Sequence, residues 1–192
     1  MRLISLILFV IIIFILVSYY RTNYIEVTFV KSDLDNKEYL VRDLPDKIKA
    51  ANMLAKIRQN IFILVDHLNQ NKPKEYEKYI DQLTSRIKDT VINENGEDNE
   101  YTSYSVSKGE QLVFCIRSKK NKDQIHQLNL IMYVTLHELA HIACPEYGHG
   151  DLFKKIFAFL ANEATKINIY TRIPFDKHPE EYCGITISES II

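Results

Sequence analysis

The segment from Gln124 to Ala143 constrains the fold more than any other part of the chain. Its apolar residues recur at helical spacing and cover nearly every face, which predicts a helix buried in the core of a folded domain. Within this helix the sequence reads His137-Glu138-Leu139-Ala140-His141. Because imidazole and carboxylate groups are costly to bury without partners, the motif predicts a specific polar interaction inside the domain.

The spacing of the two histidines predicts a metal site. Residues four apart lie on one face of a helix, one turn from each other, so His137 and His141 can reach the same ion. Zinc is bound by such rings at about 2.0–2.1 Å. Glu138 lies beside them and is expected to act as general base on a metal-activated water that attacks a carbonyl group. A surface helix with two chance histidines is the alternative, which the apolar flanks disfavour.

A third ligand is expected after the helix, because catalytic zinc sites usually take three protein ligands and leave one position for water. The helix breaks at Pro145, and His149 follows between two glycines that permit the chain to return over the metal. Glu163, in the next predicted helix, is the alternative ligand. We favour His149, because a turn with glycines on both sides suits a ligand loop better than a mid-helix position does.

The sequence HELAHIACPEYGHGDLF, which contains these residues, resembles the zincin metallopeptidases of the WLM and SprT-like group. In that group HExxH is followed by a loop, by His-Gly or His-Asp, and by an aromatic residue that packs the next helix. Residues 101–187 as a whole are similar to metallopeptidases of large DNA viruses. The resemblance implies a compact α+β zincin domain with a small sheet whose edge strand can hold an extended peptide. It also implies Zn²⁺ ligands at His137, His141 and His149, and Glu138 as catalyst.

A second catalytic candidate lies near the carboxyl end, in the matched segment EYCGITI. Tyr182 can donate a hydrogen bond to the tetrahedral intermediate, as tyrosine or histidine does in many zinc peptidases. Tyr170 is a weaker candidate for the same role, and packing is the alternative for both. Cys183 is a candidate soft metal ligand. With three histidines available, we expect it to be a small buried residue instead.

The amino-terminal segment Leu3–Tyr20 is apolar except for two serines and has no charge. A membrane-spanning helix needs about 20 apolar residues, so we expect residues 1–21 to form an uncleaved anchor and residues 22–192 the peptidase domain. A cleaved signal peptide is the alternative; its apolar region would be about 7–15 residues long and end in small residues. The expected localisation is a single-pass membrane protein, with the domain on the cytoplasmic side slightly favoured.

The net charge and the cysteine content limit the classes of partner and the cellular compartment that we expect. The formal net charge is −1, without the basic excess of a general nucleic-acid binder, which disfavours a nucleic-acid partner. The expected partners are a protein or peptide substrate and, through the amino-terminal helix, a membrane. The three cysteines are odd in number and widely spaced, which argues against a disulfide framework and fits a reducing compartment.

The remaining segments predict an ordinary α+β domain. Helical spacing of apolar residues is seen over residues 50–68, 74–90 and 151–167, and strand-like segments over residues 24–30, 101–106, 111–116 and 182–187. Together these features predict a membrane-tethered zinc-dependent metallopeptidase. The alternatives are a zinc hydrolase of another class, such as a nuclease or an amidase, and a non-catalytic membrane protein with a zincin fold. The presence of Glu138 argues against a non-catalytic protein.

Overall fold

The computed structural model describes the backbone of residues 2–24, 27–97, 101–121 and 124–192, and within the first helix the side chains of residues 6–17. The helices are α1 (Arg2–Tyr24), α2 (Lys47–Gln70), α3 (Glu77–Ile87), α4 (Leu128–Ala143) and α5 (Asp151–Lys166). The strands are β1 (Val27–Lys31), β2 (Glu38–Arg42), β3 (Val91–Glu94), β4 (Tyr104–Val106), β5 (Gln111–Phe114), β6 (Glu180–Tyr182) and β7 (Ile185–Ile187).

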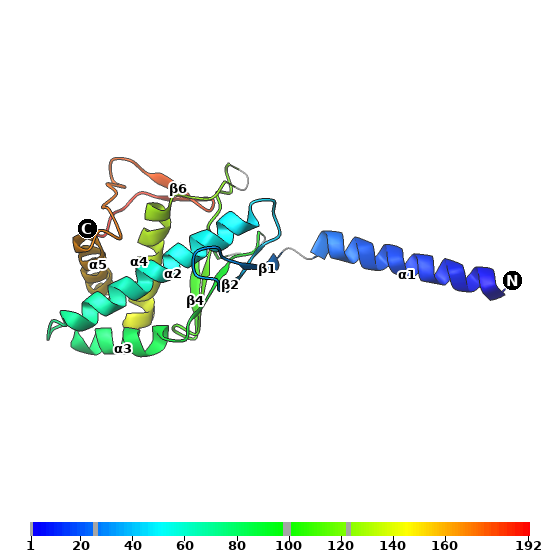
Figure 1. Cartoon of the computed structure of the whole chain (residues 1–192). Helices are drawn as coiled ribbons and strands as arrows, with labels where there is room; N and C mark the ends of the chain where they lie inside the picture. Colours follow the sequence, from blue (N-terminus) through cyan, green and yellow to red (C-terminus); the bar gives the residue numbers. More distant parts are fainter. Residues whose placement is uncertain (1, 25–26, 98–100, 122–123) are drawn as a thin grey trace.

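The core lies between α2, α3, α4 and α5, which contact one another through apolar faces. Helix α2 contributes a stripe at helical spacing, in which Leu54, Ile57, Ile61, Leu64 and Leu68 are almost completely buried. Helix α4 is buried on nearly all sides, as its apolar sequence predicts. Figure 1 shows α2 crossing α4, with α3 beneath them and α1 outside the domain.

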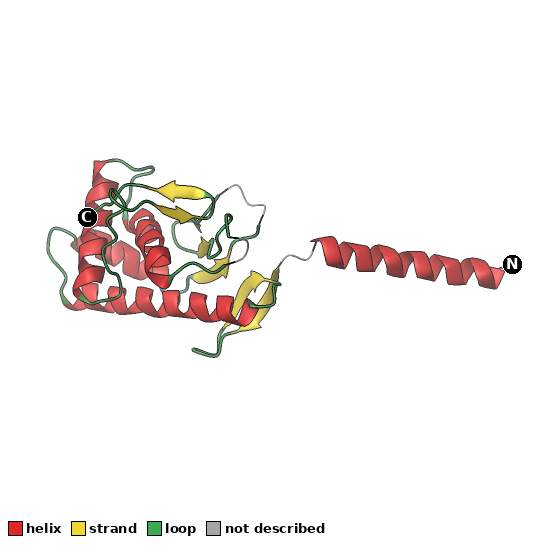
Figure 2. Cartoon of the chain, turned by 90° about the horizontal axis from the view of Figure 1, so that it is seen from above, coloured by secondary structure: helices red, strands yellow, loops and turns green. Residues whose placement is uncertain are grey.

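Three short strands form a mixed sheet in the order β3-β5-β4. Strand β3 is parallel to β5, whereas β4 is antiparallel to it and forms the edge next to α4. The turn between β4 and β5 uses positive φ at Ser107, Lys108 and Gly109. The pairs β1-β2 and β6-β7 are separate antiparallel hairpins. Figure 2 shows most of the strands gathered on the side of the domain from which α1 leaves.

Several predicted boundaries are corrected by the structure. Helix α4 begins at Leu128, because residues 124–127 run in extended form and Ile125 pairs with Arg117. The strand predicted over residues 24–30 begins at Val27; residues 25–26 lie outside the described residues. Strands β2 and β3 are absent from the sequence-based prediction, since runs of four or five residues are too short to show a clear period.

The predicted membrane anchor is wrong. Among the helices of the described residues, none combines the length and the apolar character needed to cross a bilayer. This finding contradicts three parts of the prediction: the transmembrane helix in the fold class, the membrane partner and the single-pass localisation. The predicted α+β domain is not affected.

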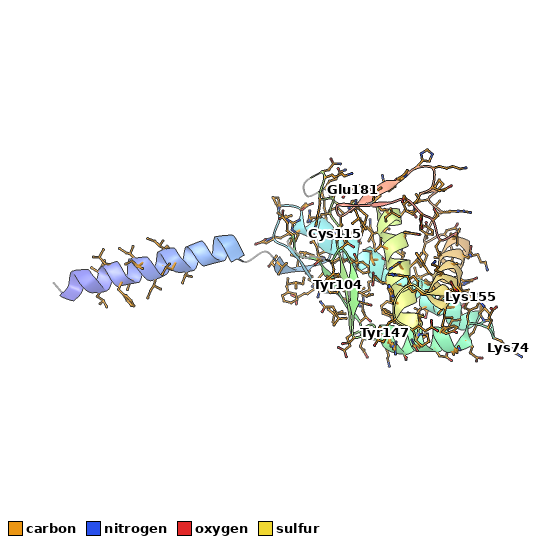
Figure 3. The ribbon with its side chains drawn as sticks, turned by 180° about the vertical axis from the view of Figure 1, so that it is seen from behind. Lys74, Tyr104, Cys115, Tyr147, Lys155 and Glu181 are labelled. Atoms are coloured by element: carbon orange, nitrogen blue, oxygen red, sulfur yellow. A yellow bond between two sulfur atoms is a disulfide. The ribbon has the colours of Figure 1, made fainter. Side chains whose placement is uncertain are left out.

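The expectation that the cysteines stay unpaired is also wrong. The sulfur atoms of Cys115 and Cys183 are 2.11 Å apart and form a disulfide across a sequence separation of 68 residues. The bond ties the end of β5, where Figure 3 labels Cys115, to the turn of the β6-β7 hairpin. Cys144 is free and buried. Sequence spacing fails here because the final hairpin folds back against β5, and the inference of a reducing compartment loses its basis.

Candidate metal centre

The end of α4 is fixed by donors from neighbouring elements. The Gln82 side chain donates hydrogen bonds of 2.9 and 3.0 Å to the carbonyl groups of Ile142 and Ala143, and Arg86 donates one of 3.0 Å to Ile142. The Lys108 ammonium group donates to the carbonyl of Cys144 at 3.0 Å. These groups satisfy carbonyls that have no partner within the helix, and the two cations also suit its negative end. The helix therefore ends at Ala143, two residues after its second histidine.

Three histidine rings, two from α4 and one from the loop after it, converge near this end of the helix. The Nε2 atoms of His137, His141 and His149 are each 3.1 Å from the other two. Tetrahedral zinc bonds of about 2.0–2.1 Å place nitrogen ligands about 3.3 Å apart, so this triangle fits such an ion. A shared hydrogen satisfies only one pair of these nitrogens at a time, whereas one ion satisfies all three. These residues can hold a metal, as the sequence predicts.

Phe153, at the start of α5, supports the histidine cluster. Its ring centroid lies 5.0, 4.3 and 4.8 Å from those of His137, His141 and His149. It is the aromatic residue of the GHGDLF segment, so the packing on the next helix that the resemblance implied is present. A ring in contact with all three ligands limits their rotation and keeps their nitrogen atoms directed at one point.

The surroundings of His137 and His141 favour the neutral form of these two rings. Burial lowers the pKa of His137 to about 3, and the neighbouring rings of His141 and His149 contribute to this decrease. Burial likewise lowers the pKa of His141 to about 4, with repulsion from His149 and Lys108. Both rings are therefore neutral at pH 7, which is the form that binds a metal through a lone pair.

Glu138 lies beside the cluster and is only 5% exposed. Burial raises the pKa of its carboxyl group to about 7, and a hydrogen bond from the backbone N–H of Ser105 opposes this rise. Ser105 belongs to the edge strand β4. The sheet edge thus holds this carboxylate in place, a contact that no sequence pattern reveals because its donor is a backbone group.

An open cavity of about 520 Å³ surrounds the cluster. Its walls include the three histidines, Glu138, and residues of β4 and of the loop after α4. Tyr104 and Tyr147, labelled in Figure 3, belong to these two walls. Since His149 is exposed, one side of the cluster faces solvent. A substrate can approach the candidate metal position from that side.

Tyr182 lies close to Glu138 but outside the lining of the cavity that surrounds the cluster. It is 1% exposed, and its hydroxyl lies 2.7 Å from the Oγ atom of Ser103. Burial raises its pKa well above the ordinary value, and the charge of Glu138 adds to the rise. Tyr182 lines a smaller cavity together with Glu138 and His137, and it does not line the open cavity around the cluster. Its predicted hydrogen bond to a reaction intermediate stays a prediction.

The alternative ligands do not join the cluster. Glu163 accepts a hydrogen bond of 2.9 Å from His67 and pairs with Lys166, with its side chain 13% exposed. Cys183 is occupied by its disulfide. Tyr170 is buried, and its hydroxyl accepts a hydrogen bond of 3.3 Å from the N–H of Ile173. This environment agrees with the alternative that Tyr170 packs in the core. Among the described residues, the three histidines are the only group of potential metal ligands this close together.

The overall fold is that of a known α+β protein. The chain is similar to the crystal structure of a Wss1 mutant from Saccharomyces cerevisiae, with a TM-score of 0.51 and 19% identity over 67% of this chain and 87% of that chain. At this identity the likeness shows the fold alone. It confirms the α+β fold that the resemblance to the WLM and SprT-like group implied.

Two viral proteins are similar to the chain in sequence. It is 50% identical over 169 residues to uncharacterized protein R325 of Acanthamoeba polyphaga mimivirus, a match that covers 87% of this chain and 85% of that protein. It is 37% identical over 83 residues to uncharacterized protein 136R of Invertebrate iridescent virus 6, which covers 42% of this chain and 44% of that protein. No family model matches the chain. The chain belongs to the same family as the mimivirus protein.

Proposed function

We propose that this protein is a zinc-dependent metallopeptidase. The observation that carries the proposal is the triangle of three Nε2 atoms, 3.1 Å apart, next to the buried carboxyl group of Glu138. Three imidazoles and an open fourth side are the ligand set of catalytic zinc. When bound there, zinc supplies Lewis acidity that polarises a carbonyl group and activates water.

Glu138 would be the general base of the reaction. A base works best when its pKa is near the working pH, and burial brings that of Glu138 to about 7. The N–H of Ser105 fixes one carboxylate oxygen, which leaves the other for the proton taken from the attacking water. The same proton can then pass to the leaving amine, as the cleavage of a peptide bond requires. Tyr182 is our candidate for a hydrogen bond to the carbonyl oxygen in this step.

The edge strand β4 would bind the substrate. It is the terminal strand of the β3-β5-β4 sheet and runs next to α4, so the histidines lie beside it. An extended peptide can add to such an edge through main-chain hydrogen bonds. That mode requires an unfolded segment of a protein or a short peptide, which is the substrate class we propose.

The test compares two variants of the zinc-loaded protein on a mixture of unfolded peptides. Glu138→Gln keeps the size of the side chain but removes the base, so we expect peptide cleavage to fall by about 10²–10⁴-fold while zinc stays bound. Glu110→Gln, at an exposed residue of the β4-β5 turn, is the matched control and should retain full activity. Equal activity of Glu138→Gln and the wild type would refute the proposed role.

A further inference from the structure

A second cavity of about 240 Å³ lies next to Glu138. It shares Ser103, His137 and Glu138 with the cavity that surrounds the histidine cluster. The two spaces therefore meet at the carboxyl group that would take the proton. The loop that carries His149 lines only the first of them. A group in the second cavity would therefore lie next to His137 and Glu138, away from the residues of that loop that line the first cavity.

The walls of this second cavity are mainly apolar. Val134 lies one helical turn before Glu138, so both side chains point from the same face of α4. The opposite wall is one face of the β6-β7 hairpin. Tyr182 pairs with Ile185 across the hairpin, and Ile187 lies two residues further along the same strand, so all three belong to this face.

The hairpin wall is held in place before any substrate binds. The disulfide from Cys183 joins it to the end of β5, and the hydroxyl of Tyr182 contacts Ser103. Glu181 accepts hydrogen bonds from the Ser118 hydroxyl and from the N–H of Gly184. The first three contacts join β6 and the hairpin turn to neighbouring elements, and the last one closes the turn itself. The cavity is thus preformed, which lowers the cost of ordering it on binding.

We propose that this cavity is the specificity pocket of the enzyme and takes an apolar side chain from a residue that flanks the cleaved bond. The inference rests on the proposed peptidase function and adds the substrate class. Pockets for whole small molecules usually measure about 300–1,000 Å³, so a space of this size suits a single side chain. Ile185 is 50% exposed and lies at the mouth, where it would contact the entering group.

The experiment uses a peptide library cleaved by the zinc-loaded protein, with the products sequenced by mass spectrometry. We expect Leu, Ile, Met or Phe to dominate one of the two positions that flank the cleaved bond. Because one methylene in an apolar pocket is worth about 10–200-fold in kcat/KM, a matched Leu peptide should exceed its Ala counterpart by at least about tenfold. Cleavage with no preference for apolar residues at either position would refute the proposed specificity pocket but not the proposed peptidase activity. An absence of cleavage would overturn both.

A variant of the pocket mouth makes the test sharper. Ile185→Asp should lower kcat/KM for the Leu peptide at least about tenfold and shift the preference towards Lys or Arg. Ile63→Asp, at a similarly exposed isoleucine on α2, is the matched control and should leave the preference unchanged. Binding of the Leu peptide to Glu138→Gln, followed by fluorescence anisotropy, should weaken in parallel when Ile185→Asp is added. Unchanged preference and binding in the Ile185→Asp variants would contradict the assignment.

Discussion

The disulfide between Cys115 and Cys183 should contribute a large part of the stability of the domain. A cross-link removes conformational freedom from the unfolded chain, and the effect grows with the length of the closed loop. With a sequence separation of 68 residues, loop-closure entropy predicts about 4 kcal/mol in the free energy of unfolding. Unfolding in urea, followed by circular dichroism with and without a reductant, measures this difference directly.

The double variant Cys115→Ser/Cys183→Ser is the control for this experiment. It should unfold at the lower urea concentration of the reduced wild type and show no response to the reductant. The remaining cysteine, Cys144, is buried and free in both proteins, so it does not account for a difference between them. A wild-type shift below about 1 kcal/mol would refute the entropic reasoning. Two free thiols at these positions in the untreated protein, found by mass spectrometry, would refute the pairing itself.

Three further predictions follow from single residues, each measured by urea unfolding. Arg117 is 2% exposed and binds Glu94 at 2.6 Å and Asp46 at 2.8 Å. Arg117→Met should lower the free energy of unfolding by about 3–5 kcal/mol, because it leaves the Glu94 carboxylate buried without its cation; a loss below about 1 kcal/mol would contradict this. Gln82→Ala removes two hydrogen bonds to the end of α4 and should lower the free energy of unfolding by about 1–3 kcal/mol. An unchanged free energy of unfolding would contradict this. Tyr147→Ala, at a side chain 89% exposed, should change stability by less than about 0.5 kcal/mol, and a larger loss would show a structural role.

The candidate metal site could be predicted in large part because its chemistry is local in sequence. His137 and His141 are one helical turn apart, and the glycines around His149 mark a turn that returns over them. The same logic placed α4, whose apolar pattern is long enough to be unambiguous. The sequence could not exclude Glu163 as a metal ligand, because it does not show that Glu163 binds His67, which is 96 residues away.

Features that depend on contacts between distant segments could not be predicted from the sequence. The support of Glu138 by the N–H of Ser105 and the Cys115–Cys183 bond both arise from the way β4 and the β6-β7 hairpin lie against other elements. The buried ion pair of Arg117 and Glu94 belongs to the same class, since RSKKNKD has the composition of a solvated loop. The membrane anchor was wrong for another reason, because no helix of the described residues is both long and apolar enough to cross a bilayer.

The zinc content of the purified protein tests the central claim most directly. It should be measured by mass spectrometry of the metal in the wild type, His149→Ala and Glu163→Ala, each shown to be folded. The account predicts about one zinc per chain in the wild type and in Glu163→Ala, and its loss in His149→Ala. A folded wild type without zinc after incubation with the ion, or a His149→Ala variant that retains it in full, would contradict the three-histidine site.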